Sequence, residues 1–269
     1  MNFLEKLAGA CRENRSLLCV GLDPDPSLMP PGIDVFEFNK AIIDASLDLV
    51  CAYKPNIAFY EALGAAGMGA LKQTRDYIPE NIPVIIDAKR GDIGNTATAY
   101  ARGLFDYYGF DAATVNPYLG YDALEPFIKY RDRGIFVLCR TSNPSATDFQ
   151  SLLLVTDTGP RMLFEIVAEK VSQWNQHGNL GLVVGATFPG ELKLLRQYYP
   201  EMPLLIPGVG AQGGELSQVV NSGVDATRTR TIINSSRQVL YASRGKDFAT
   251  AAGRAAKDLR DKINGYLAG

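Results

Sequence analysis

Two patterns of apolar and polar positions alternate along this chain. Short apolar runs rich in β-branched residues, such as 83–86 and 180–185, have the composition of strands buried on both faces. Longer segments between them, such as 34–50 and 246–266, carry apolar residues at helical spacing. The pattern predicts strands at 17–22, 52–56, 83–86, 112–116, 134–139, 180–185, 203–206 and 231–234, and helices at 2–15, 34–50, 60–77, 95–108, 122–130, 159–176, 215–221 and 246–266, with one more opening at Pro189.

This order predicts an α/β fold made of eight strand–helix units. Strict alternation of strands and helices is typical of a parallel sheet, and most of the connections are short. The chain has no linker rich in Ser, Gly or Pro and no internal repeat. The number of units and the chain length favour a single (β/α)8 TIM barrel over residues 1–269 rather than an open doubly wound sheet.

The composition agrees with one large soluble domain. Of the 269 residues, 46% are hydrophobic, which is enough for a large core, either in one α/β barrel or in two smaller domains. The formal net charge of −2 argues against a nucleic-acid partner. No apolar run approaches the ~20 residues of a membrane span, and charges interrupt the N-terminus where a signal peptide needs its apolar core. We therefore expect a cytoplasmic protein with no membrane partner.

The positions of the cysteines and of the single histidine argue against disulfides, a zinc site and a hydrolase triad. Cys19, Cys51 and Cys139 lie in apolar runs, and no paired spacing links them to Cys11, which predicts free, buried thiols in a reducing compartment. The single histidine, His177, lies in a polar turn, which argues against a zinc site. The chain also lacks the Gly-x-Ser-x-Gly turn of a hydrolase triad.

Polar side chains gather where the predicted strands end. In a (β/α)8 barrel the carboxyl ends of all strands converge on one mouth, where the chemistry takes place. Single residues have simpler interpretations, since Asn116 before Pro117 can shape a turn and Asp23 before Pro24 can cap a loop. Together they predict a site at the mouth, built from Asp23, Lys54, Asn56, Asp87, Lys89, Asn116, Ser142, Gln212 and Arg237.

The stretch 83–96 carries the densest charge at such a strand end. Side chains alternate along a strand, so Asp87 and Lys89 should point the same way. Burying an unpaired ammonium is costly, so we expect Lys54 and Lys89 to pair with a carboxylate such as Asp87. The alternatives are a solvated charged loop or, from the Arg-Gly-Asp triplet at 90–92, an adhesion motif, although nothing else in the chain is typical of a secreted protein.

A glycine-rich turn at 208–213 follows the seventh strand and opens a helix. Its Gly-x-Gly-x-x-Gly pattern also occurs in dinucleotide-binding turns. In a barrel, however, the loops after strands seven and eight usually bind phosphate, and Arg237 follows strand eight. Freed backbone amides, a helix N-terminus and Arg237 therefore predict a monophosphate site. Arg228 and Arg230 precede strand eight, so we expect them at the opposite end of the barrel with no catalytic role.

The stretch 87–96, Asp-Ala-Lys-Arg-Gly-Asp-Ile-Gly-Asn-Thr, closely resembles the Asp-x-Lys-x-x-Asp signature of the orotidine 5′-phosphate decarboxylase family, in its bacterial branch. Sugar-phosphate decarboxylases and synthases of the same barrel superfamily share this short motif, but the full set of matching segments is more specific. The resemblance implies a TIM-barrel carboxy-lyase that converts orotidine 5′-phosphate to uridine 5′-monophosphate, the last step of de novo UMP biosynthesis, without a metal or other cofactor. The further matching segments occur in the family's order at 22–24, 54–56, 59–61, 116–118, 141–144, 207–213 and 235–237.

The resemblance implies catalytic roles for four charged residues, Lys54, Asp87, Lys89 and Asp92, which match the family's charged network. In this family the matching lysine, here Lys89, protonates C6 of the pyrimidine as carbon dioxide leaves, and Asp87 orients it. The chemistry agrees, because the carbanion at C6 has no electron sink and needs a cation beside it. A proton delivered from that cation is typically worth ~10²–10⁴ in rate.

The other matching residues imply contacts with the substrate. The resemblance implies a homodimer in which Asp92, Ile93 and Thr96 are supplied to the neighbouring subunit's site. Within one subunit, the implied contacts are Asp23, Lys54 and Asn56 with the ribose, Ser142 or alternatively Thr141 with the pyrimidine, and Gln212 and Arg237 with the phosphate.

Two other functions stay open on the sequence alone. A sugar-phosphate decarboxylase or synthase of the same barrel would use a magnesium ion. A non-catalytic barrel that senses a phosphorylated ligand would bind uridine monophosphate without turnover, but it gives no reason to keep Lys54 and Lys89 beside carboxylates.

Overall fold

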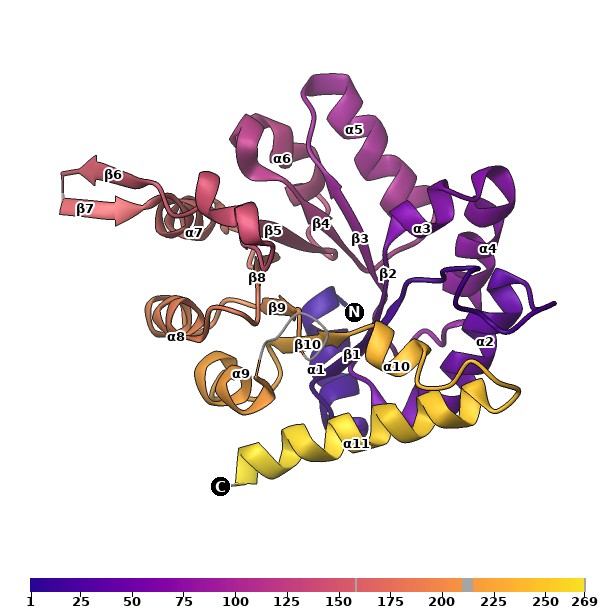
Figure 1. Cartoon of the computed structure of the whole chain (residues 1–269). Coiled ribbons are helices and arrows are strands. Elements are labelled where there is room, and N and C mark those ends of the chain that lie inside the picture. Colours follow the sequence, from indigo (N-terminus) through magenta and orange to yellow (C-terminus); the bar gives the residue numbers. More distant parts are fainter. Residues whose placement is uncertain (158, 210–214, 269) are drawn as a thin grey trace.

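Eight parallel strands form a closed ring at the centre of the computed structural model, which describes residues 1–157, 159–209 and 215–268 (Figure 1). Isolated bridges from Tyr53 to Val84 and from Asn56 to Asp87 join the first and last strands of the sheet. The predicted (β/α)8 barrel is therefore confirmed. In spatial order the strands are β2 (Ala52–Pro55), β1 (Leu18–Leu22), β10 (Thr231–Ser235), β9 (Leu204–Pro207), β8 (Leu180–Val184), β5 (Gly134–Arg140), β4 (Ala112–Val115) and β3 (Ile85–Arg90).

The helices surround this ring, as Figure 1 shows. Side-chain caps set several of their starts, because a side-chain oxygen can accept a bond from an otherwise unpaired amide. Asp34, for example, accepts from the amide of Glu37 at the start of α2. The helices are α1 (Phe3–Glu13), α2 (Val35–Ser46), α3 (Ile57–Glu61), α4 (Gly64–Tyr77), α5 (Gly94–Arg102), α6 (Tyr121–Ile128), α7 (Leu163–Trp174), α8 (Pro189–Tyr198), α9 (Leu216–Gly223), α10 (Arg237–Leu240) and α11 (Phe248–Ala268), with short 3₁₀ or π turns at Leu47–Leu49, Gly103–Tyr107, Pro117–Leu119 and Pro144–Asp148.

The apolar runs read from the sequence form the core. Every residue of β1 and of β8 is buried, as expected of strands covered on both faces. All four cysteines are buried and free, so the prediction for the thiols is confirmed. None of the described helices is long and apolar enough to cross a membrane.

A β-hairpin inserted between β5 and α7 was not predicted. It consists of β6 (Leu153–Thr156) paired antiparallel with β7 (Gly159–Met162), and it projects from the side of the barrel in Figure 1. The predicted helix at 159–176 is therefore wrong over its first turn, where Gly159 has a φ of +110° that a right-handed helix cannot use. The helix starts only at Leu163, where the carboxylate of Glu165 caps it by accepting a bond from the amide of Met162.

A second boundary differs from the prediction. The helix predicted at 60–77 is divided into α3 and α4. The break lies at Gly64, whose φ of +61° is in the left-handed region that favours glycine. The periodicity of apolar residues continues across this break, which is why the sequence pattern did not reveal it.

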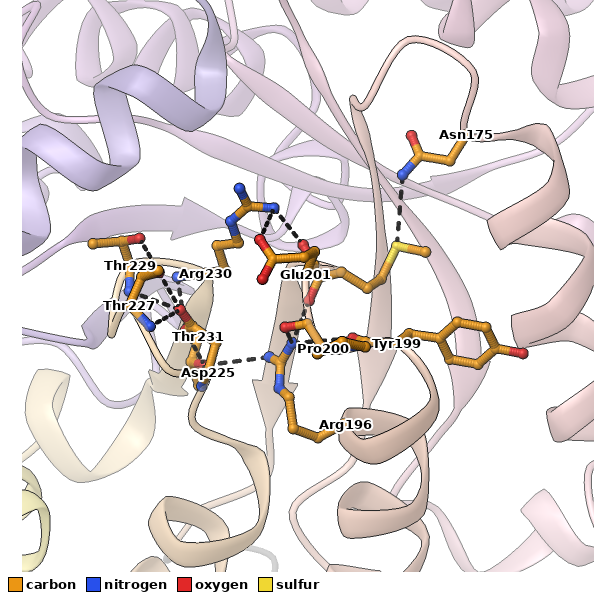
Figure 2. Close-up of polar contacts among 11 residues, drawn as sticks. Asn175, Arg196, Tyr199, Pro200, Glu201, Asp225, Thr227, Thr229, Arg230 and Thr231 are labelled. Carbon is orange, nitrogen blue, oxygen red and sulfur yellow. Dashed lines mark hydrogen bonds and ion pairs between the residues drawn. The ribbon is translucent and has the colours of Figure 1, made fainter.

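A polar network organises the loop that enters β10, at the end of the barrel opposite Arg237 (Figure 2). Asp225 accepts bonds from the amide of Arg230 at 2.9 Å and from the hydroxyl of Thr231 at 3.0 Å. Arg230 pairs with Glu201 at 3.1 Å. The predicted position of Arg230 is confirmed, and its charge serves the structure of this loop.

Candidate active site

A cavity of about 550 Å³ opens where the barrel strands end. A volume of this size suits a small ligand such as a nucleotide. The lining residues come from strands far apart in the sequence, as the barrel predicts. Of the predicted site residues, Asp23, Lys54, Asn56, Asp87, Lys89, Thr141, Ser142 and Arg237 line it.

The carboxylate of Asp87 lies between two ammonium groups at the base of this cavity. Its Oδ2 is 3.2 Å from Nζ of Lys54, and its Oδ1 is 2.6 Å from Nζ of Lys89. The hydroxyl of Thr114 donates to Oδ1 at 2.8 Å. The Lys54 side chain is only 5% exposed, whereas that of Lys89 is 48% exposed and reaches into the open part of the site. The predicted pairing of both lysines with Asp87 is confirmed.

Burial and charge oppose each other in this cluster. Burial raises the pKa of Asp87, but the ammonium groups of Lys54 and Lys89 and the hydrogen bonds lower it more, so the net pKa lies well below its ordinary value. Burial likewise lowers the pKa of Lys54, but the carboxylates of Asp87 and Asp23 raise it further, to a net value above its ordinary range. Asp87 and Lys54 are therefore both ionised at neutral pH.

Lys89 is held in an unusual backbone conformation. Its φ is +47°, in the left-handed region that costs a non-glycine residue about 1–3 kcal/mol. The pairing register between β3 and β4 also shifts between Ile86 and Arg90. Regular strand alternation is therefore not the whole reason that Lys89 faces Asp87. The amide of Lys89 donates to Thr114 at 2.9 Å, so Thr114 holds both the backbone of Lys89 and the carboxylate it contacts.

Asp23 organises a second polar group beside Lys54. It accepts a bond from the amide of Asn56 at 3.2 Å and another from the hydroxyl of Ser236. The hydroxyl of Tyr241 donates to the Asp23 carbonyl at 2.9 Å. These contacts tie together the ends of β1, β2 and β10 around one carboxylate in the cavity.

Thr141 and Ser142 differ in how their hydroxyls are used. The Thr141 hydroxyl donates to Asn143 at 2.7 Å and accepts from the carboxamide of Gln150 at 2.8 Å. Among the described residues, the Ser142 hydroxyl makes one long contact, 3.5 Å, with the carbonyl of Pro207. Ser142 is therefore the more available of the two for a ligand.

The other predicted site residues within the described part of the chain do not line this cavity. The side chains of Ile93 and Thr96 are exposed at the start of α5, and Asp92 is partly exposed and accepts a bond from the amide of Ile93. Asn116 accepts from the amide of Tyr118, so the simpler interpretation of a turn-shaping residue applies to it. Gln212 and most of the glycine-rich turn lie outside the described residues.

Sequence reasoning missed three residues that hold the site together: Thr114, Ser236 and Tyr241. Thr114 could have been found, because it is the one hydroxyl within the apolar run of β4. Ser236 could also have been found, because it lies at the end of β10 beside the predicted site residue Arg237. Tyr241 reaches Asp23 from 218 residues away, and no local pattern indicates such a contact.

A family model described as "Orotidine 5'-phosphate decarboxylase / HUMPS family" matches residues 16–252, most of the chain and nearly all of the barrel. The chain belongs to this family. The resemblance inferred from the motif at 87–96 is therefore confirmed.

Within the orotidine 5′-phosphate decarboxylase / HUMPS family, the similar curated proteins carry the first of the two names. "Orotidine 5'-phosphate decarboxylase" of Dehalococcoides mccartyi is 54% identical over 266 residues, which cover 99% of this chain and 98% of the relative. The protein of the same name from Cupriavidus necator is 50% identical over 278 residues and covers both chains completely. The solved structure of Leishmania donovani OMP decarboxylase superposes with a TM-score of 0.86 at 40% identity, with full coverage of both chains.

Proposed function

We propose that this protein decarboxylates orotidine 5′-phosphate to uridine 5′-monophosphate, the last step of de novo UMP biosynthesis, without a metal or organic cofactor. The observation that carries the proposal is the Lys54–Asp87–Lys89 cluster at the base of the cavity, in a member of this family. The named relatives, at 50–54% identity over nearly the whole chain, support the decarboxylase over other activities of the family.

The proposed reaction leaves an electron pair on C6 of the pyrimidine when the bond to the carboxylate breaks. Lys89 provides a cation beside that carbon and then transfers a proton from Nζ to it, while carbon dioxide departs. An ammonium positioned before the charge develops stabilises the transition state without reorganisation. The 48% exposure of Lys89 fits this role, because its side chain faces the space where a ligand binds.

Asp87 and Lys54 keep the proton donor in place. Asp87 stays ionised because Lys54 is close to it in a buried position, and an ionised Asp87 holds the Lys89 ammonium at 2.6 Å. Asp87 would also lie near the departing carboxylate. The cluster is thus set before substrate arrives.

The remaining cavity residues are assigned to the substrate by position. Asp23, Lys54 and Asn56 lie together and bind the ribose hydroxyls. We assign the pyrimidine amide to Ser142 rather than Thr141, because both bonding positions of the Thr141 hydroxyl are already used. Arg237, which lines the cavity, binds the phosphate, since a guanidinium forms strong bonds with a phosphate dianion. Gln212 is assigned to the same group by the family resemblance and not by position.

We further propose a homodimer in which Asp92, Ile93 and Thr96 complete the neighbouring subunit's site. Large apolar side chains are exposed on the same side of the barrel, on α5, α6 and the turn between β4 and α6, and such patches mark interfaces. α5 and α6 pack against each other, so these side chains lie on neighbouring elements. The exposed side chains are Ile93, Tyr100, Tyr118, Leu119 and Tyr121.

We place the protein in the cytoplasm. Its four cysteines are buried as free thiols, which suits a reducing compartment. Its proposed substrate and product are both phosphorylated metabolites.

One assay separates the proposed activity from the alternatives. Protein treated with excess chelator is mixed with orotidine 5′-phosphate, and the loss of pyrimidine absorbance is followed. Turnover is expected. A magnesium-dependent sugar-phosphate enzyme would instead need the metal and act on a sugar phosphate, and a binding protein would retain uridine monophosphate without any change in orotidine 5′-phosphate.

A further inference from the structure

The turn that follows β5 begins next to a buried arginine, which holds it in place. Arg140, the last residue of β5, is 2% exposed. Its Nε donates to Glu191 at 2.5 Å, and its guanidinium lies 3.9 Å from the centre of the Phe188 ring. The charge of Arg140 is thus paired and stacked, which gives a rigid base for the two residues after it, Thr141 and Ser142.

Gln150 connects this base to the turn through both ends of its carboxamide. Its Oε1 accepts from the amide of Thr141 at 2.8 Å and lies 3.5 Å from Nη1 of Arg140. Its Nε2 donates to the hydroxyl of Thr141 at 2.8 Å. Gln150 itself is held by its backbone, which donates to the carbonyl of Ala146 and accepts from the amide of Phe164.

The opposite side of the turn packs directly on the backbone of Gly185. A Cβ at Gly185 would lie 2.1 Å from Oγ and 2.8 Å from the amide nitrogen of Ser142, so only glycine fits there. The amide of Gly185 also donates to the carbonyl of Arg140 at 2.7 Å. Ser142, which lines the cavity, is therefore confined between Gly185 on one side and the Thr141–Gln150 contacts on the other.

We propose that Gln150 is a positioning residue for pyrimidine recognition. It does not line the cavity, and it acts by fixing Thr141 so that the Ser142 hydroxyl faces the pyrimidine amide. The proposal rests on the proposed function, because it assigns Ser142 to the pyrimidine.

The first test measures whether Gln150 affects pyrimidine binding separately from phosphate binding. Gln150→Ala is compared with wild type by calorimetric binding of uridine monophosphate and of ribose 5-phosphate, which lacks the pyrimidine. We expect uridine monophosphate to bind roughly tenfold more weakly, the scale of one hydrogen bond, and ribose 5-phosphate to bind unchanged. Equal weakening of both ligands would overturn the proposal.

Two further variants control for folding. Gln173→Ala removes an exposed glutamine whose side chain hydrogen-bonds to Glu169 and Lys170 on α7, and this variant should bind both ligands as wild type does. Gln150→Glu keeps the acceptor for the Thr141 amide and should weaken uridine monophosphate less than Gln150→Ala. A loss in Gln150→Glu as large as in Gln150→Ala would contradict the role given to this bond.

A double-mutant cycle with Ser142→Ala tests the route of the effect on kcat/KM for orotidine 5′-phosphate. If Gln150 acts through Ser142, then Gln150→Ala should lower kcat/KM roughly tenfold in wild type and hardly at all once Ser142 is alanine. If Gln150→Ala lowers kcat/KM by the same factor in wild type and in Ser142→Ala, the proposal is overturned. If the wild type does not decarboxylate, the proposed function fails, and the comparison of the two bound ligands still decides the role of Gln150.

Discussion

The carboxylate of Asp87 pairs with two ammonium groups at once, those of Lys54 and Lys89. Lys54, buried behind it, keeps it ionised, and Asp87 in turn holds the exposed ammonium of Lys89. Removing either lysine changes the electrostatic environment of the other. The cluster is therefore best understood as one unit, and its titration gives the first prediction.

The contribution of Asp87 to the free energy of unfolding should decrease as the pH falls. Its folded pKa lies below the ordinary 3.8, so the contribution is fully present above pH 3.8 and is lost as the pH falls through the folded pKa. Asp87→Asn leaves Lys54 buried without this partner and should lower the free energy of unfolding by roughly 3 kcal/mol. Denaturant titrations of both proteins measure this difference.

The difference should stay constant from about pH 5 to pH 9 and shrink in acid. The upper limit follows from Lys54, whose raised pKa keeps its contribution present below the ordinary 10.5 and loses it only as the pH rises through the folded value. A difference that declines between about pH 5 and pH 7 would contradict the assigned pKa directions.

Arg237 gives a second prediction at the scale of one residue. Arg237→Ala should weaken uridine monophosphate by roughly 1.5–3 kcal/mol, the contribution of a charged hydrogen bond, and leave uridine binding unchanged. Calorimetry with both ligands measures this. Arg254→Ala, an exposed arginine on α11, is the matched control. Equal losses for uridine and uridine monophosphate would refute a phosphate contact.

At this scale the sequence predicted the charges better than the groups that support them. Asp87, Lys89 and Lys54 stood out because charge at the end of an apolar strand is unusual. Gln150 lies in a polar loop where another polar residue carries no information, and its contact with Thr141 depends on how that loop folds back.

At the scale of elements, β3 and the start of α5 differ in their relation to the cavity. Asp87 and Lys89 of β3 line the cavity, whereas Asp92, Ile93 and Thr96 do not line it and are partly or fully exposed. If they serve a neighbouring subunit, inactive chains with different defects can complement each other.

Mixing Lys89→Ala and Asp92→Ala chains should therefore restore activity, to about a quarter of the wild-type level if subunits exchange at random, because one mixed site in each heterodimer is intact. Each variant alone should be nearly inactive. Activity is measured after mild dissociation and reassociation. No recovery, with exchange verified by a mass tag on one chain, would contradict the shared site.

The elements themselves were predicted where apolar periodicity was strong. The eight barrel strands were each found, because each is an apolar run bounded by polar residues. The hairpin β6–β7 was missed because both of its strands are largely exposed, so neither shows the burial pattern of a barrel strand.

At the scale of the whole molecule, one end of the barrel holds the candidate active site, and the other holds a network of buried hydrogen bonds. Arg196, buried at the second end, donates to the carbonyls of Gly223 at 2.9 Å and Met202 at 2.7 Å. It also donates to the carbonyl of Pro200 at 3.0 Å (Figure 2). Burial lowers its pKa to about 10, although Asp225 partly opposes this. These bonds connect α8 and α9 at the strand starts.

Arg196→Met should lower the free energy of unfolding by roughly 2–4 kcal/mol, because it leaves buried carbonyls without donors. The value of kcat/KM should be unchanged. Arg12→Ala, an exposed change on α1, is the control. A loss of activity with unchanged stability in Arg196→Met would contradict this division.

We also propose that residues 1–269 form one domain, so the wild type should unfold in a single transition.

The central claim is that Lys89 supplies the proton and the charge for a decarboxylation that needs no metal. The most direct measurement is the loss of absorbance of orotidine 5′-phosphate with chelator-treated wild type and with Lys89→Ala, beside binding of uridine monophosphate to both. The account predicts rapid turnover by the wild type and no detectable turnover by Lys89→Ala, which still folds and binds the product. Near-normal turnover by Lys89→Ala would contradict it.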